Sequence, residues 1–292
     1  GGGVGQTPDF WDNAYFDGAY FHNGKAVPAK GFCTDVFFDY AKRFITKVKD
    51  SEKPFFVYLC TNAPHGPMHA PEASSKPYQD QSVNLANFYG MIANIDDNVG
   101  AMRRFLKKEG LADNTIFIFT TDNGTSAGAR VHNNGMRGQK GSEYDGGHRV
   151  PFFIHWPKGG LNGGRDVDTI TSYVDIVPTL INYCQVPSPK GVKFDGVNIR
   201  PLVEGKAKNW TDRILVTDSQ RVRDPIKWRK SAVMTDQWRL VNGKELYDIN
   251  ADPGQKQNIA ATNPKVVARL TKFYDAWWEE IVPTFGQRTA IY

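Results

Sequence analysis

The stretch TIFIFTTDNGTSAGARVHNNGMRGQKGSEYDGGHRVPFFIHW, residues 115–156, holds the clearest indication of how this chain folds. It opens with TIFIFTT, a β-branched and aromatic run with the length and composition of a buried strand. A second apolar run, Phe152 to Trp156, predicts another buried strand. Glycine is frequent between the two runs, which is typical of an irregular loop. We therefore expect two core strands joined by a long glycine-rich connection.

Polar residues follow the first strand directly, at Asp122, Asn123 and Gly124. Neighbouring side chains normally point to opposite faces of a strand, but a glycine lets the backbone turn at once, so both oxygens can face one site. A carboxylate and a carboxamide side by side suit a hard cation. Because these three residue types also dominate ordinary turns, a simple turn is the alternative.

A lysine stands in the glycine-rich connection, in the sequence Gly138-Gln139-Lys140-Gly141. A lysine flanked by glycines can approach an anion closely, whereas its alternative role is that of a solvated loop residue. Further along, Arg149 precedes Val150-Pro151, and we interpret it as half of a buried ion pair that holds this corner.

A histidine follows another predicted strand, Phe55 to Cys60. His65 lies in a loop stiffened by Pro64 and Pro67, at the strand end where open α/β sheets build their sites. The spacing alone supports a functional and a structural role equally. His69 lies four residues further on, but the surrounding prolines exclude a helix, so we interpret it as a loop residue or a substrate contact.

These motifs together resemble the type I sulfatases of the alkaline-phosphatase superfamily. The family has a strand ending in Asp-Asn-Gly, then G-x-K-G-x-x-x-x-G-G-x-R-V-P and a strand, preceded by a Pro-His-x-Pro loop. Its usual C-terminal mark is matched by Glu245-Leu246-Tyr247-Asp248 with Asp252-Pro253 and Asn258. The resemblance implies an α/β fold with a mixed, mostly parallel sheet flanked by helices. It also implies that this core is incomplete at the N-terminus and followed by a small antiparallel sheet and a helix.

The resemblance also implies roles for the candidate residues. Asp122 and Asn123 match two oxygen ligands of one divalent ion, usually calcium, and Lys140 matches the ammonium that contacts the sulfate and the departing oxygen. His65 matches the group that hydrogen-bonds the same region and protonates the leaving group. The implied substrate is an aryl or carbohydrate sulfate ester. His132 and the aromatic residues of positions 1–30 are further candidate substrate contacts.

Other features of the family are missing from these residues. Its formylglycine nucleophile arises within C/S-x-P-S-R; the run Cys184 to Ser188 fails this pattern because its proline comes one place late, and Pro189 replaces the arginine. Asp96-Asp97 imitates a metal-binding pair, but it falls within a predicted helix and should face solvent or cap the helix. We therefore expect the C-terminal two-thirds of a sulfatase, inactive alone, whose partner is the missing N-terminal segment or another chain. Sulfatases are commonly exported, so the analogy suggests a periplasmic or secreted protein.

Two alternatives belong to other classes. A superfamily hydrolase of phosphate diesters or phosphonates would share the core but would need further aspartates and histidines around two ions, and the motif around Lys140 argues against it. A non-catalytic binding module is the second alternative.

Composition excludes several classes. The net charge of +5 is small beside 36 basic and 31 acidic residues, and no basic run of the kind that binds nucleic acid occurs. The sequence contains no apolar run long enough to span a membrane. Three cysteines are too few and too scattered for a disulfide framework, and Cys60 and Cys184 are expected to be buried thiols because they lie in apolar runs.

Hydrophobic periodicity predicts the remaining elements. Amphipathic helices are expected over Thr34 to Lys49, Ser82 to Glu109 and Thr171 to Cys184, and a last one after the N-cap Asn263. Asn242-Gly243 predicts a hairpin. Residues 1–30 are expected to be loop. We predict a partial sulfatase core over residues 1–205 and a C-terminal antiparallel subdomain with a terminal helix over 206–292.

Overall fold

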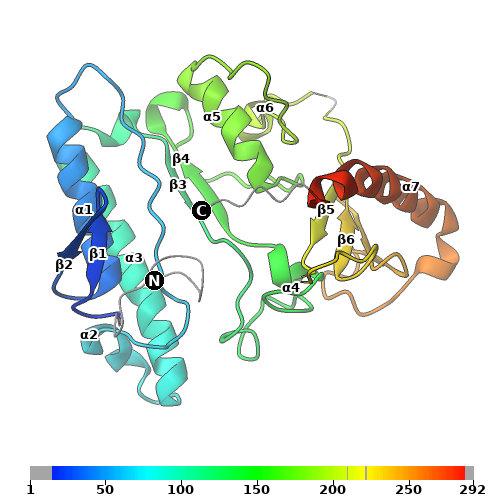
Figure 1. Cartoon of the computed structure of the whole chain (residues 1–292), viewed down its shortest axis with the longest axis horizontal. Helices are drawn as coiled ribbons and strands as arrows, with labels where there is room; N and C mark the ends of the chain where they lie inside the picture. Colours follow the sequence, from blue (N-terminus) through cyan, green and yellow to red (C-terminus); the bar gives the residue numbers. More distant parts are fainter. Residues whose placement is uncertain (1–14, 209, 221, 287–292) are drawn as a thin grey trace. The chain divides into compact units, whose positions relative to one another are not determined.

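The computed structural model describes residues 15–208, 210–220 and 222–286 (Figure 1). The chain divides into two compact units, Gly1–Thr115 and Ile116–Tyr292. The domain boundary expected at residue 206 stays a prediction. No helix in the described ranges is both long and apolar enough to cross a bilayer.

The first unit opens with a hairpin, β1 (Ala19–His22) against β2 (Lys25–Pro28), in the register Ala19↔Pro28. Its turn is Asn23-Gly24, with φ of 52° and 78°. Left-handed backbone at both positions is what a two-residue hairpin needs. The expectation of loop throughout residues 1–30 was therefore wrong over this hairpin, and residues 1–14 lie outside the described part.

Two long helices form the body of the first unit. Both α1 (Cys33–Val48) and α3 (Val83–Lys108) confirm the predicted helices and pack against each other. Asp35 of α1 accepts hydrogen bonds from the Asn94 and Asn98 amides of α3, at 2.9 and 2.6 Å. Short elements follow each helix: α2 (Glu72–Ser75) and η1 (Lys76–Tyr78) before α3, and η2 (Ala112–Asn114) after it. Asp96 and Asp97 are exposed on α3, as predicted.

The segment predicted as a strand, residues 55–60, belongs to no β-ladder in the described residues. Its side chains alternate between half-buried and exposed, and the Phe56 side chain is 75% exposed. A strand becomes buried only when neighbouring strands and a second layer cover it, and no strand of the first unit pairs with this one. Cys60 and Cys184 are exposed, so the expectation of buried thiols was wrong; Cys33 is the buried cysteine.

The second unit begins with β3 (Phe117–Thr120), which pairs with β4 (Phe152–His155) in the register Thr120↔Phe152. Both strands were predicted, but they are partly exposed, with Phe153 63% exposed. Their pairing is antiparallel, as is every ladder in the described ranges, whereas the resemblance predicted a mostly parallel sheet. The connection from β3 to β4 holds only the single-turn helix α4 (Asp145–His148) and lacks the long helix that usually joins two parallel strands.

Helix α5 (Ile176–Cys184) continues from η4 (Tyr173–Asp175), which confirms the helix expected from Thr171. Ser172 and Asp175 form a capping box at its start. The buried Asp175 carboxylate also accepts two hydrogen bonds from Arg213, at 2.8 and 2.9 Å. The short elements η3 (Pro157–Gly159) and α6 (Arg200–Val203) lie to either side in the sequence.

The C-terminal part is a four-stranded antiparallel sheet covered by a helix, as predicted. The strands β5 (Leu215–Asp218), β6 (Ser231–Met234), β7 (Trp238–Val241) and β8 (Glu245–Asp248) pair in sequence order. Asn242-Gly243 makes the predicted hairpin, with φ of 51° and 68°. Helix α7 (Pro264–Ile281) lies along the sheet in Figure 1 and buries Leu270 and Tyr274 against it. The one-turn elements η5 (Ala260–Thr262) and η6 (Val282–Gly286) flank it.

The opposite face of this sheet is not solvated. Ala232, Val241 and Tyr247 form a second buried cluster, on which Tyr144 of the glycine-rich connection packs. The sheet therefore holds α7 on one face and part of the loop between β3 and β4 on the other.

Candidate active site

Asp122, Asn123 and Gly124 form the turn that ends β3, with Asp122 exposed and Asn123 half-buried. Gly124 N–H donates to the Gly147 carbonyl at 3.0 Å. A Cβ on Gly124 would lie 1.9 Å from the Gly146 carbonyl oxygen, and Gly124 is not among the residues with positive φ. The sequence indicated that this position needs glycine, but for the freedom of its backbone. The structure gives another reason, which is close packing against a neighbouring loop.

The loop that carries Lys140 is fastened to the same turn. Lys140 N–H donates to the Thr125 carbonyl at 3.0 Å. Gly138 and Gly141 on either side have φ of 86° and 80°, which only glycine adopts readily. Among the described residues no carboxylate pairs with the half-buried Lys140 side chain. The structure thus brings Asp122, Asn123 and Lys140 into one cluster of loops in the second unit.

A buried ion pair lies next to this cluster of loops. Asp145 is fully buried and accepts from Arg239 Nε at 2.9 Å, and its own N–H donates to Gln255 Oε1 at 2.9 Å. Burial lowers the pKa of the Arg239 guanidinium, and the Asp145 carboxylate opposes that effect. The pair expected for Arg149 is peripheral: its guanidinium lies 3.8 Å from Asp145, but the side chain is 58% exposed. That expectation was therefore wrong, because Arg239 supplies the buried partner.

His65 lies in the first unit, in an exposed loop between the cis peptide bonds Ala63-Pro64 and Gly66-Pro67. Its Nδ1 donates to the Gly66 carbonyl at 2.9 Å, since a carbonyl can only accept. The Tyr15 hydroxyl donates to the His65 carbonyl, and the Tyr15 and His69 rings form a T-shaped pair with 6.3 Å between their centroids. The loop therefore fixes which nitrogen of His65 remains available, namely Nε2.

Tyr173 is a neighbour of the Asp122 turn that the sequence did not reveal. Its hydroxyl donates to the Thr121 carbonyl and lies 3.4 Å from Thr120 Oγ1. Burial raises the pKa of Tyr173, the hydrogen bond with Thr120 lowers it, and the Asp122 carboxylate raises it. The capping pattern Ser172 to Asp175 was the available signal, because it places Tyr173 at the first position of this turn. His132 lies exposed in the connection, and its backbone N–H donates to the Gly128 carbonyl at 3.0 Å.

The turn offers the kind of ligand that a hard cation prefers, but too few of them for a complete site. Carboxylate and carboxamide oxygens are the ligands that calcium prefers. Within the described ranges, no three side chains of His, Cys, Asp or Glu converge as a metal site. Asp122 and Asn123 would therefore supply part of a coordination shell.

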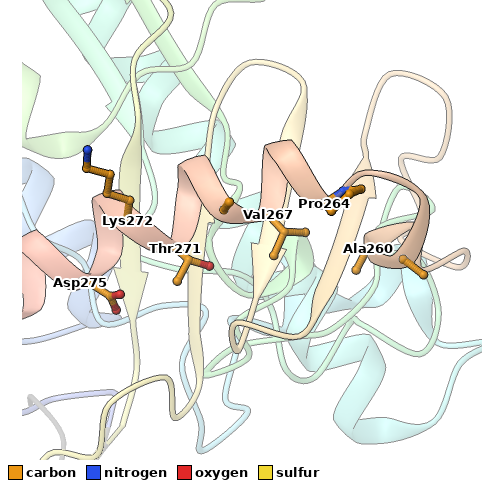
Figure 2. A pocket seen from close by; sticks show the side chains of 8 residues that line it. Ala260, Pro264, Val267, Thr271, Lys272 and Asp275 are labelled. Carbon is orange, nitrogen blue, oxygen red and sulfur yellow. The ribbon is translucent and has the colours of Figure 1, made fainter.

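A hollow of the second unit lies elsewhere, along α7 (Figure 2). It has a volume of about 700 Å³ and is open to solvent. Ala260 and Pro264 lie at one end of it, and Lys272 and Asp275 at the other. None of the four predicted site residues lines this hollow.

Comparison with known proteins identifies the class and then the family. The fold is that of the alkaline-phosphatase-like sulfatases. The crystal structure of Ps i-CgsB in complex with k-i-k-neocarrahexaose superposes with a TM-score of 0.80 at 27% identity, over 88% of this chain and 57% of that one. A phosphonate monoester hydrolase of Agrobacterium radiobacter, with a TM-score of 0.58 at 22% identity over 97% of this chain and 65% of that one, shares the fold alone.

The family follows from the sequence comparison. The sulfatase family model matches residues 4–186, and the model of the N-sulphoglucosamine sulphohydrolase C-terminal region matches residues 139–276. Since the first match covers more than half of the 292 residues, the chain belongs to the sulfatase family, as its motifs predicted.

Two curated relatives give the extent of the match. The uncharacterized sulfatase YdeN of Escherichia coli is 36% identical over 88% of this chain and 52% of its own length. An arylsulfatase of Clostridium perfringens is 28% identical over 72% of this chain and 50% of its own length. The chain thus spans about half the length of the curated relatives it matches.

Proposed function

We propose that this chain supplies the metal-binding turn and two sulfate contacts of a sulfatase that cleaves an aryl or carbohydrate sulfate ester. The observation that carries the proposal is the hydrogen-bonded cluster of the Asp122–Asn123 turn with the Lys140 loop, through Lys140 to Thr125 and Gly124 to Gly147. An anionic ester needs positive charge at its equatorial oxygens and at its bridging oxygen. A lysine held next to a cation-binding turn supplies both.

The roles follow from the donor chemistry. The Asp122 carboxylate and the Asn123 amide oxygen hold a divalent cation, most suitably calcium, and when bound the ion polarises the sulfate group. The Lys140 ammonium neutralises charge on the sulfate and on the departing oxygen. His65 donates a proton to the leaving group from Nε2, because Nδ1 is already engaged with Gly66.

The nucleophile is not among these groups. The 292 residues contain no C/S-x-P-S-R motif, so we propose that the isolated chain does not turn over a sulfate ester. The nucleophile then comes from other sequence of the same protein or from a second chain. The carbohydrate complex of Ps i-CgsB and the similarity to an N-acetylgalactosamine-6-O-sulfatase of Bacteroides thetaiotaomicron support a sulfated carbohydrate as substrate. We also propose that the protein is periplasmic or secreted, as the resemblance to commonly exported sulfatases implies.

The first test uses the purified chain with 4-nitrophenyl sulfate and 4-methylumbelliferyl sulfate. No product is expected, and steady turnover would contradict the proposed dependence on an external nucleophile. The second test measures inorganic sulfate binding by calorimetry. Lys140→Met should weaken it by about tenfold, since a charged hydrogen bond is lost. The control Lys158→Met changes an exposed lysine outside the cluster and should bind as the unaltered chain does.

Two alternatives make different predictions in the same assays. A hydrolase of phosphate diesters or phosphonates would bind inorganic phosphate in preference to sulfate. A non-catalytic module would bind sulfate no better after calcium is added, because its turn would serve only as a turn.

A further inference from the structure

Arg137 stands three residues before Lys140, and although its side chain is 41% exposed, its guanidinium makes several contacts. Its guanidinium carbon lies 3.8 Å from the centroid of the Tyr144 ring and 5.8 Å from that of Tyr247. Nη1 donates to the Tyr247 hydroxyl at 2.8 Å and to the Gln255 carbonyl at 3.1 Å. Nη2 donates to the Tyr144 hydroxyl at 2.8 Å.

The acceptors of Arg137 are themselves fixed. The hydroxyls of Tyr144 and Tyr247 both donate to Glu245 Oε2, at 2.8 and 2.6 Å. Each hydroxyl thus accepts from the guanidinium and donates to the carboxylate, which uses a phenol fully. Burial together with Glu245 raises the pKa of Tyr247 to about 12, so this phenol remains a donor near neutral pH.

Two of these partners come from the C-terminal sheet. Glu245 and Tyr247 lie on β8, and Gln255 lies in the loop after it, whereas Arg137 and Tyr144 belong to the connection between β3 and β4. These hydrogen bonds therefore link the C-terminal sheet to the glycine-rich loop. A guanidinium is suited to this link, since its planar fork bonds several acceptors while its face stacks on an aromatic ring.

The main chain of Arg137 closes the loop that contains Lys140. The Arg137 carbonyl accepts from Gly146 N–H at 2.8 Å, so residues 137–146 form a loop with joined ends. Gly146 fits there only because it has no side chain, as a Cβ would lie 2.5 Å from the Gly138 carbonyl oxygen. Fixing the Arg137 side chain consequently fixes the base of the loop from which Lys140 extends.

We propose that Arg137 is a positioning residue for Lys140, through which the C-terminal sheet becomes a component of the sulfate site. The inference rests on the proposed role of Lys140 and adds the residue that holds it in place. If the Arg137 contacts served stability alone, their loss would not act on sulfate binding through Lys140. The measurements below separate these two roles.

The first measurement is amide hydrogen exchange of the full chain. Arg137→Gln should speed exchange at Lys140, Ser142 and Gly146 by about ten- to hundredfold, because several hydrogen bonds to a charged group are lost. Arg269→Gln, which breaks an exposed pair with Asp212, is the matched control and should leave these amides unchanged. Unchanged exchange in Arg137→Gln would overturn the inference. If that variant does not fold, Arg137→Lys, which keeps the charge, takes its place.

The second measurement is a double-mutant cycle on the affinity for inorganic sulfate. Arg137→Lys should weaken binding by about tenfold in the unaltered background and should change little when Lys140 is already methionine. Equal losses in both backgrounds would show that Arg137 does not act through Lys140. If the unaltered chain does not bind sulfate, the proposed function is overturned and this inference falls with it, even where exchange shows that Arg137 holds the loop.

Discussion

Position 124 requires glycine because of the atoms around it, and not because of its own backbone angles. It passes so close to the Gly146 carbonyl that any side chain would displace the main chain of the loop opposite. The same contact includes the hydrogen bond from Gly124 to Gly147. A glycine after Asp122 and Asn123 therefore secures the contact between the turn and the Lys140 loop.

Replacing Gly124 by alanine should destabilise the second unit by about 2–4 kcal/mol, since the added carbon overlaps main-chain atoms that cannot move freely. The matched control is Gly100→Ala within α3, where the added carbon would meet only the flexible end of Arg104 at 3.3 Å. That change should be neutral or stabilising by up to about 1 kcal/mol, because alanine favours a helix. Calorimetric melting of both variants checks the opposite signs, and equal melting temperatures would contradict the packing argument.

Helix α5 shows how one buried carboxylate can hold an element in place. Asp175 caps the start of the helix, accepts from the Val197 N–H at 2.9 Å and pairs with both terminal nitrogens of Arg213. The carboxylate is entirely buried, and the Arg213 side chain is 13% exposed. The position of Tyr173, next to Asp175 in the same short turn, depends on this arrangement.

Arg213→Met should cost about 3–5 kcal/mol of unfolding free energy, because it leaves the Asp175 charge buried without a partner. Arg269→Met breaks an exposed pair of the same residue types and should cost less than about 1 kcal/mol. Denaturant titration of the two variants measures the difference. Similar losses would mean that burial of Asp175 has no energetic consequence.

A histidine on helix α4 should make the stability of the chain depend on pH. His148 lies on this helix, and burial lowers the pKa of its imidazole from the ordinary 6.5, although Asp145 opposes the shift and Arg239 adds to it. Its Nε2 donates to the Glu143 carbonyl at 3.2 Å. Between the lowered pKa and pH 6.5 the unfolded chain binds the proton and the folded chain does not. The free energy of unfolding must then decrease as the pH is lowered through this range.

We therefore expect the melting temperature to fall as the pH is lowered from above 6.5, and to fall less in His148→Gln. The replacement keeps a donor for the Glu143 carbonyl but cannot take up a proton. Melting curves at a series of pH values compare the two proteins. Parallel pH profiles would show that His148 does not contribute to the pH dependence.

The whole molecule should bind calcium weakly. Asp122 and Asn123 are the two proposed oxygen ligands, and the part of the chain that the structure describes holds no group of three His, Cys, Asp or Glu side chains that could bind a metal. Calorimetry should give a dissociation constant of about 10⁻⁴ M or weaker, as in weak natural calcium sites with few charged ligands. Asp122→Asn should abolish the remaining heat. Micromolar affinity in the unaltered chain would contradict an incomplete site.

The sequence predicted the local conformations of the candidate site, whereas the roles of its residues stay proposals. A turn of Asp-Asn-Gly after a strand, a lysine between two glycines of positive φ and a histidine between two prolines can be recognised because their conformations depend on a few neighbouring residues. The same holds for Asn242-Gly243. Asn23-Gly24 carried the same signal and was overlooked inside a segment expected to be loop.

The sequence by itself determined the two long helices, the C-terminal sheet with its covering helix, and the residues that form the loop cluster. Only the tertiary structure decided that β3 and β4 pair antiparallel, that residues 55–60 join no ladder, and that Arg239, rather than Arg149, balances Asp145. The physical reason is separation along the chain. The hydrophobic period that predicts a helix lies within the helix itself, whereas the partner of a strand or of a buried charge can lie far away in the sequence. Asp145 and Arg239 are 94 residues apart, and nothing near either one names the other.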